Sequence, residues 1–199
     1  MVPGDAALRR AVAWVACLNI GYFGIEFSVA ISIGSVSLFA DSIDFLEDAV
    51  VNGLIVLALQ WSTRQRARVG MALAGILLVP GVAALWTAWE KLASAVPPAA
   101  APLSLTGLGA FVVNLGCALV LAGFRHHGGS LTKAAFLSAR NDVLANAAIV
   151  LAGVVTLWTA SVWPDLVVGL GIVVMNANAA REVWTTARDE HLAAHSAEP

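Results

Sequence analysis

DSIDFLEDAVVNGLIVLALQW, residues 41–61, is the segment from which the fold class of this chain follows. Four carboxylates stand in its first eight residues, and only 12 uncharged residues separate the last of them from Trp61. A bilayer core about 30 Å thick needs about 20 helical residues to cross it. A helix ending at Trp61 can therefore span the membrane only if it takes the acids inside. The segment predicts a transmembrane helix that carries buried carboxylates.

Composition supports a membrane protein. Of 199 residues, 59% are hydrophobic and 12% are charged, against about 45–50% and about 25% in soluble domains. The net charge of −2 without a basic patch argues against nucleic-acid binding. Cys17 and Cys117 both lie in apolar stretches, so no disulfide framework is predicted. The lipid bilayer is the expected surroundings of the chain.

The few charges mark the ends of the spans, and we predict an all-α integral membrane protein with six transmembrane helices. A Pro-rich loop at 94–104 divides an uncharged stretch that is too long for one span. The expected organisation is a cytoplasmic tail at 1–8, one membrane domain at 9–186 and a short cytoplasmic tail at 187–199. The six spans are expected at about 9–30, 38–61, 70–92, 104–125, 131–157 and 164–186.

The basic residues predict the orientation. Nine of the 11 Lys and Arg residues fall on the side of the two termini, whereas Lys91 is at the opposite side and Arg140 lies inside a span. Basic residues favour the cytoplasmic side, so both termini are expected in the cytoplasm and the chain in the plasma (inner) membrane. Tryptophans near span ends agree with these limits: Trp61, Trp86, Trp89, Trp158, Trp163 and Trp184.

Three of the acids share one face of the second span. At about 100° per residue, Asp41, Asp44 and Asp48 fall within a stripe of about 60°, and Glu47 points away from it. Burying three carboxylates together is costly unless a cation, protons or water offset their charge. An oxygen-rich stripe of this kind predicts a divalent-metal site. The alternative is that the span begins later and the acids are solvated.

The fifth span carries a second polar cluster. Ser138 and Asp142 share a face at i, i+4, and Asn141 is adjacent to it. Arg140 points elsewhere and needs an acidic partner within the membrane. Glu47 is the preferred partner, Glu26 is a second candidate, and extension of the side chain to the cytoplasmic interface is the alternative.

The two clusters resemble each other. The pattern Asp44-x-x-x-Asp48-x-x-x-Asn52 parallels Ser138-x-x-x-Asp142-x-x-x-Asn146 at a constant offset of 94 residues. Two helices with matching polar faces suggest one binding site between repeat-related spans near the middle of the membrane. Chance likeness of two short segments is the competing explanation.

At these residues the chain resembles the cation diffusion facilitator family of divalent-metal transporters. The family pattern has an Asn and an acid in span one, a Gly-Ser-x-(Ser/Ala)-Leu-x-Ala-Asp block before an acidic pair, a His/Asp-x-x-x-Asp pair in span five and Asp-Pro at span six. The matching segments are Asn19, Glu26, Gly34–Asp41, Asp44, Asp48, Ser138, Asp142 and, with Pro and Asp transposed, Trp163–Asp165. The resemblance covers about 8–186.

The resemblance implies a six-helix cation-efflux bundle, usually a homodimer, that exports Zn²⁺ or a related cation (Cd²⁺, Mn²⁺, Fe²⁺ or Co²⁺) in exchange for protons. Carried over by position, the ligands are Asp44, Asp48 and Asp142, with Ser138 where His is common. Serine is a poorer ligand than imidazole, so Asp41 or Asn141 is expected to complete the shell, and the metal preference is open. The chain is expected to be a short form without the family's cytoplasmic C-terminal domain.

Grouped carboxylates in a low-dielectric setting are expected to hold protons near neutral pH, which a divalent cation would displace. The transported metal is the only ligand expected, with no resident cofactor. The alternative function is a non-transporting metal-binding sensor or accessory subunit. An enzyme is not expected, because no His or Cys is near the acidic clusters in the sequence to form a nucleophile–base pair.

Overall fold

The computed structural model describes residues 3–58, 82, 84–124 and 129–196, and every regular element in these ranges is a helix. The all-α class predicted from the sequence is therefore confirmed. The third predicted span is described only at 82 and 84–94. The helices are α1 (Pro3–Ile33), α2 (Val36–Ala58), a helical stretch at 84–94, α4 (Ala100–Ala122), α5 (Gly129–Thr159) and α6 (Trp163–Ser196).

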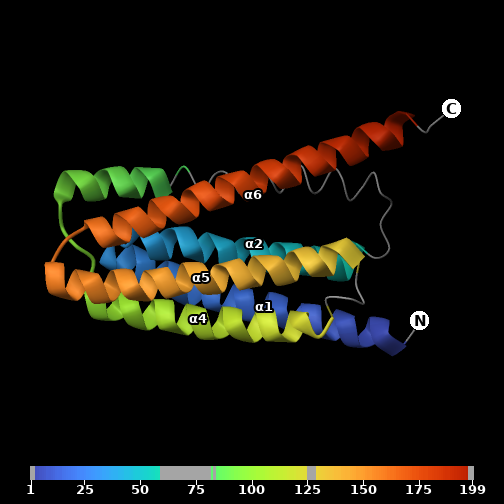
Figure 1. Ribbon diagram of the computed structural model, residues 1–199, viewed down its shortest axis with the longest axis horizontal. Coiled ribbons are helices and arrows are strands. Elements are labelled where there is room, and N and C mark those ends of the chain that lie inside the picture. The colour runs from blue at the N-terminus through green and yellow to red at the C-terminus, as the bar shows by residue number, and fades with distance from the viewer. Residues whose placement is uncertain (1–2, 59–81, 83, 125–128, 197–199) are drawn as a thin grey trace.

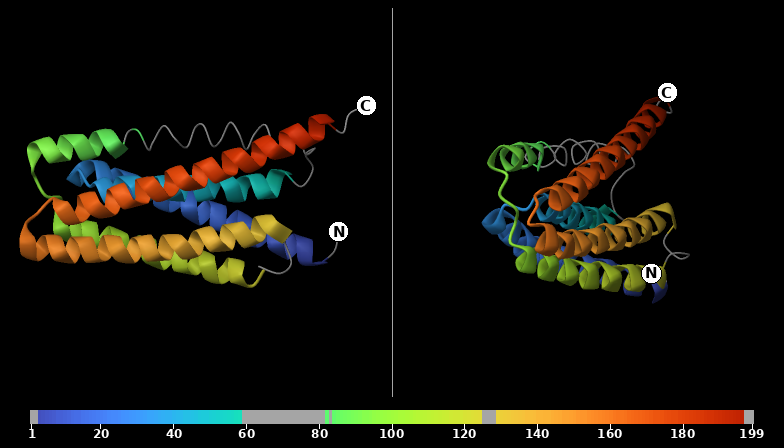
Figure 2. Two further views of the ribbon diagram at one scale, coloured as in Figure 1. Left: turned by 45° about the horizontal axis from the view of Figure 1, so that its top comes forward. Right: turned by 60° about the vertical axis from the view of Figure 1, so that its left-hand side comes forward.

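The helices run side by side along the bundle; α1 and α2, α4 and α5, α2 and α5, and α5 and α6 are antiparallel neighbours, whereas α2 and α6 run in the same direction (Figure 1). Helices α1 and α2 form one hairpin, α4 and α5 form another, and α2 contacts α1, α5 and α6. Both termini lie at one end of the bundle in Figures 1 and 2, and we call it the terminal end. The opposite end, the turn end, holds the turns at 34–35 and 160–162 and the segment 95–99. Helix α2 thus runs from the turn end to the terminal end, and α5 runs the other way.

Among the described residues, three helical segments are long and apolar enough to cross a membrane: Ala6–Ile33, Ala100–Ala122 and Ala139–Thr159. Trp163–Met175 in α6 is a shorter apolar stretch. Helix α2 has 23 residues, which at 1.5 Å each give about 34 Å, enough for a bilayer core of about 30 Å. Its four carboxylates lower its hydropathy, so composition alone does not mark α2 as a span.

The surface of the bundle is apolar, as lipid contact requires. Large hydrophobic side chains are exposed on α1, on the helical stretch at 84–94 and on α4, α5 and α6, and Trp158 at the end of α5 is 87% exposed. Trp86, Trp89, Trp158 and Trp163 are exposed near the turn end, which agrees with the predicted interfacial belt. The expectations for Trp61 and for the side chain of Trp184 lie outside the described residues.

Several boundaries differ from the sequence prediction. The loop expected at 94–104 is confined to 95–99, because Pro102 occupies the first turn of α4, where a missing N–H breaks no helical hydrogen bond. Helix α6 continues to Ser196, so most of the predicted tail at 187–199 is helical. Six of the ten residues at 187–196 are Ala, Leu, Glu or Arg, which favour helix.

Candidate cation site

The acidic stripe of α2 is buried. Asp41, Asp44 and Asp48 are 0%, 9% and 6% exposed, and the helix begins at Val36, before all of them. The alternative in which these acids precede the span in solvent is therefore wrong. Glu47 lies off the stripe and is half-buried. Residues on one face of a helix recur every three or four positions, which is why the three aspartates turn inward together.

Asp142 of α5 faces this stripe from across the α2–α5 contact. Its carboxyl is 9% exposed, lies within hydrogen-bonding range of Asp48 and interacts electrostatically with Asp41. Asp44 in turn interacts most strongly with Asp142. The structure thus brings together Asp44, Asp48 and Asp142, the three residues that the sequence placed in one cluster.

The cluster is not in the geometry of a loaded metal centre. Within the described ranges, no group of three or more His, Cys, Asp or Glu side chains is arranged to hold one metal ion. The carboxyl groups are close enough to interact electrostatically with one another. A shared cation would have to draw them closer, replacing their mutual repulsion with attraction.

The other proposed ligands differ from one another in placement. Ser138 is on α5, one turn before Asp142, but its side chain lies outside the described residues. Asn141 is exposed, and its Oδ1 accepts a hydrogen bond from Arg140 at 3.4 Å. Arg140 is also exposed, and no ion pair joins it to Glu47, although the structure describes both side chains. The preferred pairing of Arg140 with Glu47 is therefore wrong, because Arg140 points outward from α5.

Asn52 and Asn146 occupy equivalent positions in the two helices. Each is buried, and each amide donates to the backbone carbonyl one turn earlier, Asn52 to Asp48 at 2.8 Å and Asn146 to Asp142 at 2.7 Å. Among the described residues, neither Oδ1 atom receives a hydrogen bond. The two asparagines of the repeat therefore have the same local side-chain geometry.

Glu26 of α1 and Asp41 of α2 form a second pair of buried acids. Both are 0% exposed, and their carboxyl groups are close enough to interact with each other. In the part of the chain that the structure describes, no N–H or O–H group donates to either one. Two carboxyl groups form a hydrogen bond only when they share a proton. The pair therefore extends the acidic region from α2 toward α1.

Asp165 is a buried acid that the sequence reasoning assigned no role. It is 0% exposed in the first turn of α6 and accepts four hydrogen bonds from the start of α2. Both hydroxyls, of Ser35 and Ser37, donate at 2.6 Å, and the backbone N–H groups of Val36 and Ser37 donate at 2.8 and 3.2 Å. A lone acid opening an apolar span was the available signal, but its partners are 128 to 130 residues away.

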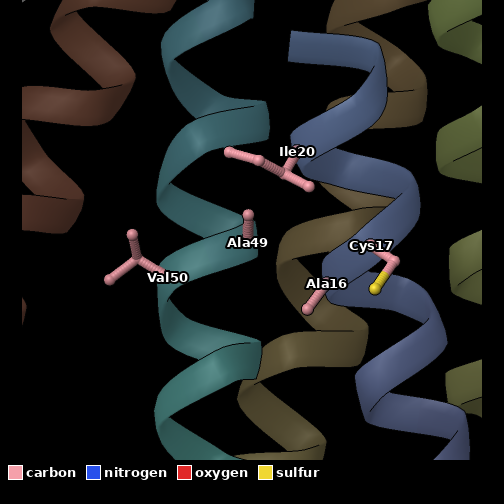
Figure 3. Close-up of a pocket in the computed structure, with 5 residues that line it drawn as sticks. All are labelled: Ala16, Cys17, Ile20, Ala49 and Val50. Atoms are coloured by element: carbon pink, nitrogen blue, oxygen red, sulfur yellow. The ribbon is translucent and has the colours of Figure 1, made fainter. Parts of the chain in front are cut away.

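An apolar hollow of about 260 Å³ lies between α1 and α2 and is lined by Ala16, Cys17, Ile20, Ala49 and Val50 (Figure 3). None of these side chains carries an oxygen ligand, and only Cys17 can ligate a metal. The hollow is therefore separate from the carboxylate cluster, although Ala49 follows Asp48 directly.

The comparison with known families agrees with this arrangement. The model of the cation efflux transmembrane domain matches residues 12–189. The chain belongs to the cation efflux family. This finding confirms the family identified from Gly34–Asp41 and the paired acids, and it makes the chain a multi-pass membrane protein of a family that transports metal cations. No curated protein matches the chain.

Membership in the cation efflux family fits the division of polar groups among the helices. The matched range spans α1 to α6 and includes both Asp48 on α2 and Asp142 on α5. Transport of a cation across a membrane requires polar ligands where lipid would otherwise exclude charge. The buried acids of α2 and α5 are polar side chains of this kind inside the bundle.

Proposed function

We propose that this chain exports divalent metal cations in exchange for protons, with Asp44, Asp48 and Asp142 as the ligands of the transported ion. The observation that carries the proposal is the meeting of these three buried carboxylates across the contact between α2 and α5. Ionisable side chains buried within a membrane bundle are costly and mark ion pathways.

The cation we propose first is Zn²⁺, followed by Cd²⁺, Mn²⁺, Fe²⁺ and Co²⁺. A site built of carboxylates and neutral oxygens is harder than a typical zinc site and discriminates less among these ions. Asp41 supports the role of fourth ligand better than Asn141 does, because Asp41 is buried and interacts with Asp44 and Asp142, whereas Asn141 is exposed. Ser138 remains a candidate through its place one turn before Asp142.

Proton exchange is supported by the contacts between acids. The Glu26–Asp41 and Asp48–Asp142 contacts each need a shared proton to form a hydrogen bond. Loading either two protons or one divalent cation leaves the region with similar charge, so neither form meets a large barrier in the bilayer. Alternating access around a fixed site between repeat-related helices would then carry each in turn.

We further propose that the terminal end faces the cytoplasm across the plasma (inner) membrane and that the chain forms a homodimer. The orientation is supported by the nine basic residues on that side. Reporter tags at the N- and C-terminus should both be accessible only from the cytoplasm. A tag accessible from outside the cell would contradict this orientation.

The deciding experiment is uptake of Zn²⁺ into proteoliposomes with and without an opposing pH gradient, followed by internal fluorescent metal and pH reporters. We expect zinc uptake to be accelerated by the gradient and accompanied by proton release. Zinc binding to the purified protein without any flux would favour the sensor or accessory role instead. Flux that is indifferent to the pH gradient would retain cation transport and reject the proton exchange.

A further inference from the structure

The start of α2 is held against α6 by a compact polar network at the turn end. Besides the four bonds that Asp165 accepts, the Nζ atom of Lys91 donates to the carbonyl of Gly34 at 2.7 Å. Lys91 is 7% exposed and also attracts Asp165 electrostatically. The one basic residue that the sequence placed at this end is thereby explained. It brings the helical stretch 84–94 into the same network as α2 and α6.

Two glycines let the helices approach this closely. Gly34 has a φ of +60°, a left-handed conformation that favours glycine and turns the chain from α1 into α2. A Cβ atom on Gly169 of α6 would lie 2.7 Å from the backbone nitrogen of Ser37. Only a residue without a side chain allows α6 to pack against the backbone of α2 here.

The hydrogen bonds to Asp165 also match the partial positive charge at the N-terminus of α2. The first N–H groups of a helix have no partner within the helix, and together they favour an anion. Asp165 satisfies two of these N–H groups, at Val36 and Ser37, from another helix. Hydrogen bonds to an ionised carboxylate are roughly twice as strong as neutral ones. The network therefore ties α2 to α6 rather than merely ending a helix.

The part of α2 next to this network is buried. Every residue from Ser35 to Phe45 is buried except Phe39, which is half-buried. Asp44, near the end of this stretch, is 9% exposed, and beyond it Asp48 and, on α5, Asp142 are 6% and 9% exposed. The turn end of the bundle is thus closed in this conformation. The buried residues that close it lie between Asp165 and the cation ligands.

We propose that Asp165 is a latch, because its hydrogen bonds to the start of α2 hold the turn end of the bundle closed. These bonds break when the bundle opens and exposes the cation ligands to the turn-end side. This inference rests on the proposed function, since only a transporter must expose its ligands to both sides. Asp165 is a positioning residue here: it acts through the start of α2 and not by touching the cation. Opening at this end has to separate the start of α2 from α6, and the bonds to Asp165 cross that boundary.

The test uses a cysteine placed behind the latch. Ala40 is 0% exposed and one turn inward from Val36, so Ala40→Cys, in a background with Cys17→Ala and Cys117→Ala, reports access from the turn end. A membrane-impermeant maleimide is added on that side of oriented proteoliposomes. We expect slow labelling with Asp165 present, and labelling at least about tenfold faster with Asp165→Asn, the factor expected for losing a hydrogen bond to a charged group.

Glu90→Gln is the matched control, because Glu90 carries the same charge near the same end but is exposed and binds only the indole of Trp86 among the contacts seen. Labelling should not change in this variant. Equal labelling in the Asp165→Asn variant and its parent would overturn the latch, and so would an equal rise with Glu90→Gln. If Asp165→Asn does not fold, Ser37→Ala, which leaves Asp165 and both backbone donors in place, should still speed labelling, and no change there would also overturn it.

A second readout separates a latch from a merely structural cap. Shifting the population toward the open form should lower the half-saturating Zn²⁺ concentration on the turn-end side by about the same factor as labelling rises, with little change on the terminal side. A cap that only supports folding would alter both sides alike. Labelling does not depend on transport, so a chain that moves no metal would refute the proposed function and leave the latch testable.

Discussion

Asp165 and Asp41 are both fully buried carboxylates, yet their surroundings are opposite. Asp165 accepts four hydrogen bonds from two serine hydroxyls and two backbone N–H groups. Asp41 faces another acid, Glu26, and no described group donates a hydrogen bond to it. Burying an acid without donors costs several kcal/mol. Asp165, with its four hydrogen bonds, therefore fits a role in holding helices together. Asp41, which receives no hydrogen bond from the described groups, fits binding of a transported ion.

This contrast distinguishes two roles of a buried acid in a membrane bundle, which are to hold helices together and to bind an ion. At the turn end, donors from α2 and a nearby lysine compensate the charge within the protein itself. At Asp41, no described group donates a hydrogen bond, so compensation is left to protons or a cation. The predictions below test whether the two regions respond to substitution in these different ways.

The largest effect is expected at the carboxylate cluster. Asp48→Ala or Asp142→Ala should each lower zinc transport at least about 100-fold, because outer-shell partners of metal ligands alone are worth about 10–100-fold. Flux into proteoliposomes measures the loss, and size-exclusion chromatography should show that both variants remain folded. Transport at the parental rate in either variant would remove that residue from the site.

Asp165→Asn should reduce stability more than any single change at the cluster. The amide of Asn cannot accept all four bonds, and a buried donor left without a partner costs about 1–3 kcal/mol. The melting temperature of the purified protein reports this loss. Asp165→Asn with unchanged stability would mean that the network contributes nothing and that the contrast with Asp41 fails.

Glu26→Gln should change stability in the opposite direction. Its amide can donate to Asp41, which turns two facing acids into a donor and an acceptor and should stabilise the fold by about 1 kcal/mol. The same melting assay, run beside Asp165→Asn, compares the signs directly. Destabilisation by Glu26→Gln would show that this pair is structural, as the Asp165 network is.

The smallest effect concerns the choice of metal. Ser138→His would add the imidazole that suits tetrahedral Zn²⁺ to a set of oxygen ligands. The parent should therefore discriminate less than the variant against Mn²⁺ and Cd²⁺, by a few-fold in competition for transport. Unchanged selectivity with full activity would mean that position 138 does not face the ion.

Helical periodicity and charge spacing were enough to predict the class of the fold and the carboxylates that meet. Asp44 and Asp48 lie one turn apart, so their shared face is a local property that sequence reveals. Asp142 joined them through a repeat visible in the chain. These features need no knowledge of how distant helices pack.

What the sequence did not predict depends on contacts between helices. The partners of Asp165 are about 130 residues away, and nothing in the residues next to it signals them. Arg140 was assigned an acidic partner because an intramembrane arginine needs one, but the rotation of α5 turns it outward. Spacing gives the relative direction of side chains on one helix, and it does not fix which direction faces the core.

The antiparallel course of α2 and α5 has a consequence for the resting state of the protein. The 94-residue offset relates α2 to α5, two helices that run in opposite directions. Exchanging the conformations of the two repeat-related parts of the chain would therefore turn a bundle closed at one end into a bundle closed at the other. The position 94 residues before Asp165 is Met71, and those 94 residues after Ser35 and Ser37 are Gly129 and Leu131. The sequence therefore has no equivalent of Asp165 and its two serine donors at the repeat-related positions. If Asp165 is the latch proposed above, the conformation closed at the turn end has contacts that the conformation closed at the terminal end lacks, and an unloaded carrier should prefer to begin its cycle open toward the terminal end.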